Sequence, residues 1–145
     1  MSRILLLSTV LFAMTACSRG TDVAPTLAGE VAGSYQTNGY LDVSCVALPA
    51  TQMPAVGIRQ ESDVAVTITY QRQYPVAQTF TLPHVQLQRL VDQRVKLVYA
   101  GEDIGTAQMD RAFSSNGMES QAMVLRLSRL AGPESDRFVF IGSKQ

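Results

Sequence analysis

The sequence predicts an all-β fold, laid out as an antiparallel meander of about eight strands. Residues 63–71 alternate strictly, with Val64, Val66, Ile68 and Tyr70 on one face, and this period of two is typical of a half-buried strand. Turn-forming residues separate segments of this kind at short intervals. After the first thirty residues, no long stretch combines a helical period with freedom from helix breakers.

Two hairpins are the clearest elements of this meander. Each consists of two β-rich segments joined by a short connection that contains glycine, which is the sequence pattern of a hairpin. The predicted strand pairs are 95–100 with 104–109, and 122–130 with 137–142. Between the two units, Asn116-Gly117 is a strong signal for a tight turn.

Weaker strand candidates fill the rest of the folded part. They are residues 33–40, 56–60, 76–82 and 85–90. Pro83 is expected to separate the last two, because proline cannot donate a ladder hydrogen bond. Residues 46–54 contain two prolines and are predicted to form a loop or a single helical turn. This spacing of strands and turns is typical of a closed barrel or of two stacked sheets.

Composition and charge exclude several classes of function. The 145 residues correspond to one domain, with 46% hydrophobic and 17% charged residues. The formal net charge is zero, whereas a nucleic-acid-binding domain needs a basic surface. One histidine and two cysteines do not supply a typical zinc or iron–sulfur framework or a set of disulfides. We therefore expect no metal, no cofactor and no nucleic-acid partner.

The N-terminus carries the pattern of a secretory signal. Arg3 precedes an apolar run over residues 4–16, which is shorter than the roughly 20 residues that span a bilayer and has the length of a signal-peptide core. The run ends at Met14-Thr15-Ala16-Cys17, which resembles the lipobox of bacterial lipoproteins. The resemblance implies cleavage before Cys17, lipidation of its thiol with fatty acyl chains such as palmitate, and acylation of the new amino terminus. An ordinary signal peptide with a coincidental cysteine is the alternative.

These features divide the chain into three parts. Residues 1–16 are the expected signal peptide, residues 17–30 the lipidated cysteine with a flexible tether, and residues 31–145 a single β domain. Three acyl chains would hold the protein firmly at a membrane, because each buried methylene contributes about 0.8 kcal/mol. The resemblance implies a cell-envelope protein. In Gram-negative lipoproteins, an aspartate directly after the lipidated cysteine tends to retain the protein in the inner membrane. Ser18 stands at that position, so the resemblance implies the outer membrane, on its periplasmic or surface side, if the source is Gram-negative.

The first predicted strand carries a short motif, Gly33-Ser34-Tyr35. It stands where the lipocalin signature has Gly-x-Trp, and with the meander it makes the folded part similar to the lipocalin-like β-barrels of small bacterial lipoproteins. The likeness covers residues 31–144 in outline, without the C-terminal helix of large lipocalins. It implies an eight-stranded barrel, and a β-sandwich of the immunoglobulin type is the alternative.

Few residues are candidates for nucleophilic catalysis. His84 is the sole imidazole, and Cys45 is the sole thiol once Cys17 is lipidated, so a nucleophile–base pair would have to combine these two. No family signature surrounds either residue. We predict a partly exposed His84 at a strand end and a buried Cys45 without a disulfide partner, on one side of a short possible strand with Val43. The chain is therefore expected not to be an enzyme.

Acidic and basic residues also offer candidates. Glu61 with Asp63 and Glu102 with Asp103 could hold a metal or act as acid and base, but acidic residues are common in turns and we predict solvated charges. Nine arginines follow the signal peptide and spread along the chain. We predict that they lie on outward strand faces, where charge discourages edge pairing. The alternative is that a few line the barrel and bind an anion.

Two functions fit these expectations. The first is a membrane-anchored envelope lipoprotein that binds a small apolar or amphipathic ligand or a protein partner. The second is a structural or interaction lipoprotein with a packed interior and no ligand. An eight-stranded barrel is either filled by side chains or holds one small ligand. Val64, Val66, Ile68 and Tyr70 are large and favour packing. The small residues Ala100, Gly105, Ala107 and Ala122 would leave room if they faced inward.

Overall fold

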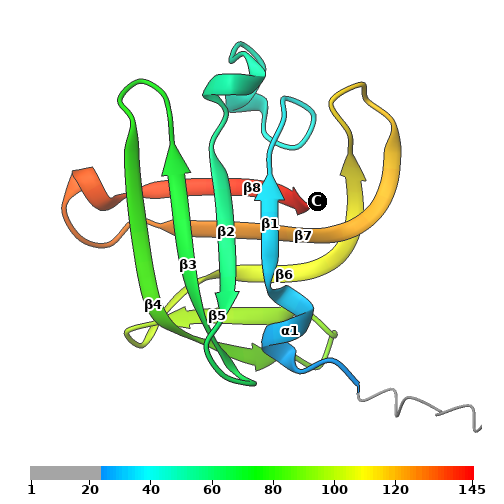
Figure 1. Cartoon of the computed structure of the whole chain (residues 1–145), viewed down its shortest axis with the longest axis vertical. Helices are drawn as coiled ribbons and strands as arrows, with labels where there is room; N and C mark the ends of the chain where they lie inside the picture. Colours follow the sequence, from blue (N-terminus) through cyan, green and yellow to red (C-terminus); the bar gives the residue numbers. More distant parts are fainter. Residues whose placement is uncertain (1–23) are drawn as a thin grey trace, which may run out of the picture.

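A computed structural model gives the structure of this chain and describes residues 24–145. Eight strands form a closed antiparallel barrel in which consecutive strands pair and β8 pairs back to β1 (Figure 1). The strands are β1 Gly33–Gln36, β2 Ala55–Gln60, β3 Ala65–Arg72, β4 Gln78–Arg89, β5 Val95–Tyr99, β6 Glu102–Phe113, β7 Glu119–Arg129 and β8 Phe138–Lys144. The predicted all-β meander and lipocalin-like barrel are confirmed, and the β-sandwich alternative is wrong.

The alternation of the sequence decides which side chains fill the barrel. In β3, Val66, Ile68 and Tyr70 are buried, and alternate positions of a strand point to opposite faces of a sheet. Stacked aromatic rings occupy part of the interior, with the centroids of Tyr70 and Phe138 4.4 Å apart and those of Phe80 and Phe138 6.0 Å apart. The interior of the barrel is therefore packed with side chains.

The strands run in two directions. β1 to β4 stand upright in Figure 1, while β5, β7 and β8 run across behind them. The seam that closes the barrel is narrow, because β1 and β8 pair only through Tyr35↔Lys144 and Gln36↔Ser143. β6 and β7 are long and extend past their outer neighbours. The continuation forms a two-stranded ribbon, residues 108–113 with residues 119–123.

Pro83 does not divide β4, contrary to the sequence prediction. The ladder with β3 pairs Ile68 with Leu82 and Val66 with Val85, so Pro83 and His84 together lie opposite one residue. This is a β-bulge, in which an extra residue stays out of the ladder. Proline loses no ladder hydrogen bond there, and His84 takes a left-handed backbone with φ of 57°. The expected strands 76–82 and 85–90 are therefore one strand.

The described part of the expected tether is folded from Thr26 onward. Leu27–Val31 forms a short helix, α1, whose first turn is capped by the Thr26 hydroxyl accepting a hydrogen bond from the Gly29 N–H at 3.0 Å. Ala28 and Val31 are fully buried against the barrel. The Tyr35 hydroxyl donates a 2.6 Å hydrogen bond to the Val31 carbonyl. Packing, and not helical periodicity, orders this segment.

The long β1–β2 connection contains two 3-10 turns, η1 (Val43–Cys45) and η2 (Ala50–Gln52). The predicted strand containing Val43 and Cys45 is therefore wrong, although Cys45 is buried as expected, at 3% exposure. Val43 is 84% exposed instead. The β6–β7 turn at Asn116-Gly117 is confirmed, with Gly117 at a φ of 79°.

Candidate functional site

The candidate site is a cavity of about 950 Å³ at one end of the barrel. We call this the loop end and define it by the β1–β2 connection (37–54), the β3–β4 turn (73–77) and the β6–β7 turn (114–118), which lie together at the top of Figure 1. The opposite α1 end comprises α1, the β2–β3 turn (61–64) and the β4–β5 turn (90–94).

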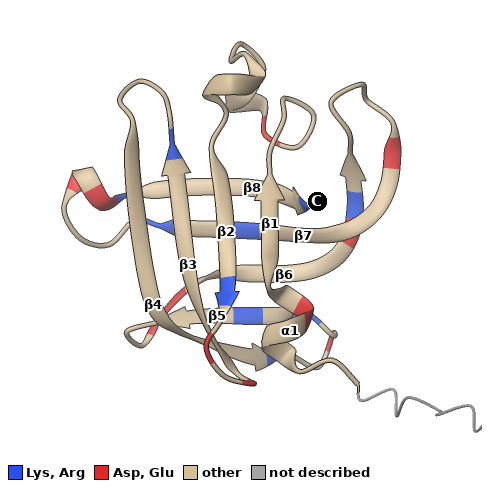
Figure 2. Ribbon diagram, in the orientation of Figure 1, with Lys and Arg blue, Asp and Glu red and all other residues tan. Residues whose placement is uncertain are grey.

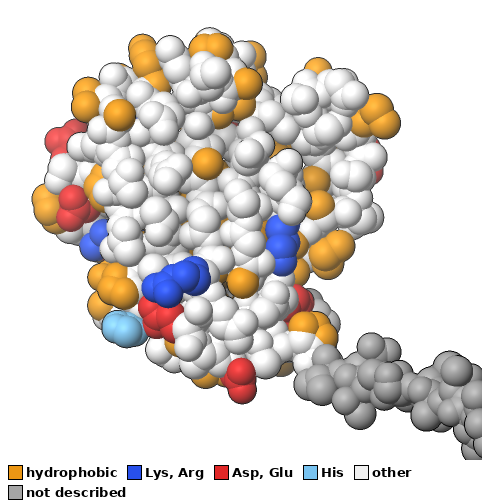
Figure 3. Space-filling model, in the orientation of Figure 1, with side chains coloured by type: hydrophobic (Ala, Val, Ile, Leu, Met, Phe, Trp, Pro, Cys, Tyr) orange, Lys and Arg blue, Asp and Glu red, His pale blue; other side chains and the backbone are white. Residues whose placement is uncertain are grey.

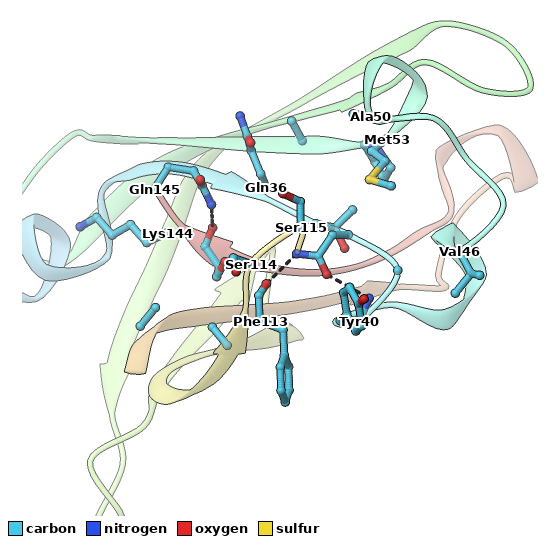
Figure 4. Close-up of a pocket in the computed structure, with 18 of the residues that line it drawn as sticks. Gln36, Tyr40, Val46, Ala50, Met53, Phe113, Ser114, Ser115, Lys144 and Gln145 are labelled. Atoms are coloured by element: carbon cyan, nitrogen blue, oxygen red, sulfur yellow. Dashed lines mark hydrogen bonds between the residues drawn. The ribbon is translucent and has the colours of Figure 1, made fainter. Parts of the chain in front are cut away.

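The cavity exists because β7 and β8 separate. Their ladder ends at Val124↔Ser143, and β8 then follows β1, with the Gln145 N–H donating to the Ser34 carbonyl at 3.0 Å. The β6–β7 ribbon leans toward the β1–β2 connection instead, where the Asn38 side chain donates to the Phe113 carbonyl at 2.6 Å. Figure 4 shows the space between them.

The cavity wall carries almost no charge. Its polar groups are uncharged amides and hydroxyls: Gln36, Thr37, Asn38, Thr51, Gln73, Ser114, Ser115, Ser120, Ser143 and Gln145. Lys144 is the one charged lining residue, and its ammonium group donates to the Glu30 carbonyl of α1 at 3.0 Å. The hydroxyl of Thr37 is buried and has no hydrogen-bond partner among the described residues. Such a wall favours an uncharged group that donates and accepts hydrogen bonds.

Large apolar side chains are exposed over the loop end, and two of them, Tyr40 and Val46, line the cavity. Several of the large hydrophobic residues that the barrel exposes lie in the three loop-end segments: Tyr40, Val43, Val46, Tyr74, Val76 and Met118. Asp42 is the single charged residue of these segments, and Figures 2 and 3 show few charges and many hydrophobic side chains over the same loops. Exposed apolar patches of this kind mark interaction sites.

The two candidates for nucleophilic catalysis are not brought together. Cys45 lies in η1 at the loop end, whereas His84 lies in the β4 bulge beside the β2–β3 turn at the α1 end. Burial raises the pKa of the Cys45 thiol, with the nearby Asp42 carboxylate acting in the same direction and the Ser44 hydrogen bond opposing them. A raised pKa disfavours the reactive thiolate.

His84 instead belongs to a polar cluster that supports the bulge. The Glu61 carboxylate accepts from the backbone N–H of His84 at 3.3 Å and contacts the His84 ring nitrogen Nδ1 at 2.8 Å. The Thr67 hydroxyl also donates to Glu61. The Thr67 hydrogen bond lowers the pKa of Glu61 most, desolvation opposes it, and the contacts with His84 lower it further.

Of the other acidic candidates, Asp63 and Asp103 have partners among the described residues, whereas the Glu102 carboxylate has none. Asp63 accepts the Ala28 N–H through its backbone carbonyl at 3.0 Å, and Asp103 pairs with Lys96 at 3.0 Å. No group of three or more His, Cys, Asp or Glu residues within 24–145 is arranged to hold a metal ion. Outward positions are confirmed for most of the arginines in this range. The exposed ones are Arg59, Arg89, Arg94, Arg111, Arg126 and Arg137.

Cys17 and the expected signal peptide lie outside the described residues. Within the described range, none of the helices has the length and hydropathy needed to cross a bilayer. Comparisons of the chain with protein-family models, with curated proteins and with solved structures find no match.

Sequence reasoning named one residue of the cavity, Ala122, as a small side chain that would leave room. It does line the cavity, whereas Ala107 is fully buried in the core. The other lining residues come from loops and strand ends that are far apart in the sequence. The signal that could have found the site is the near absence of charge from residues 37–54, 73–77 and 114–118.

Proposed function

We propose that this protein is a lipid-anchored binding module of the bacterial cell envelope, and that its loop end holds an uncharged, partly apolar ligand or protein partner. The observation that carries the proposal is the cavity of about 950 Å³, whose wall is mostly uncharged and polar, at a loop end that exposes large apolar side chains. Ligand sites typically enclose about 300–1,000 Å³ and combine apolar surface with a few oriented polar groups.

The packed interior limits where a ligand would bind. The alternative function, a structural lipoprotein without a ligand, is favoured by the aromatic rings of Tyr70, Phe80 and Phe138 that fill part of the barrel. These rings leave the loop-end cavity free, since none of them lines it. Binding at the mouth of a filled barrel therefore accounts for both observations.

The proposed anchor would leave the loop end accessible. Nine residues, 18–26, separate Cys17 from α1, and α1 lies at the opposite end of the barrel from the loop end (Figure 1). A lipid on Cys17 would hold the α1 end nearer the membrane. The loop end would then face away from the lipid, toward envelope components in solution or on another surface.

Native mass spectrometry of the purified protein tests the binding proposal. We expect a retained non-covalent ligand whose mass adds to that of the chain. Ala122→Trp, which fills the cavity, should abolish the adduct, whereas Gln121→Trp, on the other face of β7, should keep it. Equal thermal melts would show that both variants fold. No adduct on the wild-type chain, or an adduct unaffected by Ala122→Trp, would contradict binding in this cavity.

A separate experiment tests the anchor. Cys17→Ser should abolish metabolic labelling with radioactive palmitate and release the protein from the membrane fraction, because the thiol that carries the acyl chains is gone. Ser18→Ala is the matched control and should keep both labelling and membrane attachment. Undiminished labelling of Cys17→Ser would refute lipidation at this residue.

The proposed role is binding without catalysis. His84→Ala and Cys45→Ser should each leave the physiological role intact in a deletion strain, because the two residues lie at opposite ends of the barrel. A null phenotype from either variant with an unchanged thermal melt would instead indicate catalysis.

A further inference from the structure

The β6–β7 ribbon leaves an unpaired strand edge on the wall of the cavity. Residues 119–123 of β7 pair with β6 through Glu119↔Phe113 to Met123↔Met109, but pairing with β8 begins only at Val124. Within residues 24–145, none of the backbone hydrogen bonds outside the strand ladders involves residues 119–123. In an antiparallel strand the backbone groups alternate between the two sides, so part of this segment has amide and carbonyl groups without a strand partner.

Of the other strand edges that lack a partner among the described residues, those of β4 and β6 are protected against pairing. Residues 78–85 of β4 lack a partner on the β5 side but contain Pro83 and the bulge at His84. Residues 108–113 of β6 lack a partner on the β5 side but carry Asp110 and Arg111. Proline, bulges and charged side chains are the usual means of preventing edge pairing.

The β7 edge has little of this protection. Residues 119–123 read Glu-Ser-Gln-Ala-Met, with one acidic residue at the turn and no proline or basic residue. Ser120 and Ala122, which share one face of the strand, are small and line the cavity. The edge therefore borders an uncharged space in which the side chains of an added strand would meet amides, hydroxyls and apolar groups.

We propose that residues 119–123 of β7 accept an extended, uncharged segment of a partner protein, which adds to the barrel as an extra strand. This inference rests on the proposed binding function and names its ligand class. Strand addition draws affinity from main-chain hydrogen bonds and specificity from pockets for alternate side chains. The uncharged amides and hydroxyls around the edge match the donors and acceptors of a peptide backbone. The one charged lining residue, Lys144, has its ammonium group hydrogen-bonded to the Glu30 carbonyl.

The occupant is a single strand and not a second barrel. On its far side the cavity is bounded by Ser143 and Gln145 of the chain's C-terminal part and by Gln36 of β1 (Figure 4). The tip of the ribbon is held to the β1–β2 connection by Asn38 and by the contact of the Tyr40 and Phe113 rings, whose centroids are 6.4 Å apart. A space enclosed in this way admits one extended chain, whereas the sheet of a second copy would meet these walls.

The test uses the purified chain and a blocked peptide of alternating threonine and valine, acetylated and amidated so that it carries no charge. At millimolar concentration the peptide should slow amide hydrogen exchange in residues 119–123 at least fivefold and leave residues 124–129 unchanged. The controls are two peptides of the same sequence, one N-methylated at the odd-numbered amides and the other at the even-numbered amides. At least one of these two peptides should bind tenfold or more weakly, because methylation removes the donors that pair with the edge.

Two variants locate the binding. Ser120→Lys places a long charged side chain in the cavity and should weaken peptide binding at least tenfold. Ser128→Lys adds the same charge at an exposed position of β7 outside the edge, where β7 is paired with β8, and should change peptide binding less than twofold, with both thermal melts at the wild-type value.

Three results would overturn strand addition. They are no slowing of exchange at millimolar peptide, binding of both methylated peptides as tight as that of the unmethylated peptide, and a dimer in sedimentation experiments that Ser120→Lys dissociates. If the peptide fails while mass spectrometry still shows an adduct lost in Ala122→Trp, the binding function stands and only the strand-addition inference falls.

Discussion

The α1 end and the loop end of this barrel are built on different principles. At the α1 end, buried apolar residues and paired charges close the barrel: Val31 is fully buried, and Arg89 pairs with Glu30 while Arg94 pairs with Asp92. At the loop end, Asp42 is the single charged residue of the connecting segments, and apolar side chains face solvent around a cavity. The difference shows that the stabilising contacts and the candidate binding surface occupy separate parts of one small domain.

The largest expected effect comes from truncating a buried residue at the α1 end. Val31→Ala should lower the free energy of unfolding by about 2 kcal/mol, because it removes buried methyl groups and leaves a cavity. The matched control at the loop end is Val43→Ala. It should change the free energy of unfolding by less than about 0.5 kcal/mol, since Val43 is 84% exposed. Urea unfolding of both variants measures the two values. Equal losses of unfolding free energy in the two variants would contradict the difference between the α1 end and the loop end.

The next effect concerns one hydrogen bond. Tyr35→Phe removes the hydroxyl that donates to the Val31 carbonyl and should cost about 1–2 kcal/mol, because the buried carbonyl is left without a partner. Tyr40→Phe at the loop end makes the same chemical change on an exposed ring and should leave the unfolding midpoint in urea nearly unchanged. A Tyr35→Phe midpoint equal to that of the wild type would show that α1 is not anchored by this bond.

Acid should weaken the α1 end through Glu61. The pKa of Glu61 is lowered in the folded state, chiefly by the Thr67 hydroxyl, so its stabilising effect is complete above the unfolded pKa of about 4.3. That effect is lost as the pH falls through the lower folded pKa. Thermal melts between neutral pH and pH 3 should therefore fall less steeply for Glu61→Gln than for the wild type. The control is Glu102→Gln, because Glu102 is exposed and its carboxylate has no hydrogen-bond partner within residues 24–145. This variant should follow the wild-type curve, and identical curves for all three proteins would contradict a role for Glu61.

The smallest effect concerns the reactivity of Cys45, without a change in stability. In a Cys17→Ser background, Cys45 should react with a thiol reagent at least tenfold more slowly in the folded protein than in urea, because burial restricts access and raises the pKa of the thiol. Rapid labelling of the folded protein would show that the loop end opens readily. A dimer on non-reducing gels would indicate that Cys45 pairs between chains.

The sequence determined the β architecture because period-two alternation is a local signal. The alternation in 63–71 and the glycine-containing hairpin connections are enough to predict β3, the β5–β6 hairpin and the β6–β7 turn. Two local signals were misleading. Pro83 reads as a break but lies in a bulge where no ladder bond is lost, and residues 27–31 show no helical period yet fold because Ala28 and Val31 are buried.

Only the tertiary structure decided the closure of the barrel and the location of the site. Barrel and sandwich share the same strand alternation, and the choice depends on the short β1–β8 ladder between residues more than a hundred positions apart. The cavity depends likewise on where β8 leaves β7 for β1, which brings Gln36, Ser120 and Ser143 together. Strand alternation fixes which face a side chain takes, but not which distant strand it meets, because that pairing is set by the packing of the whole chain.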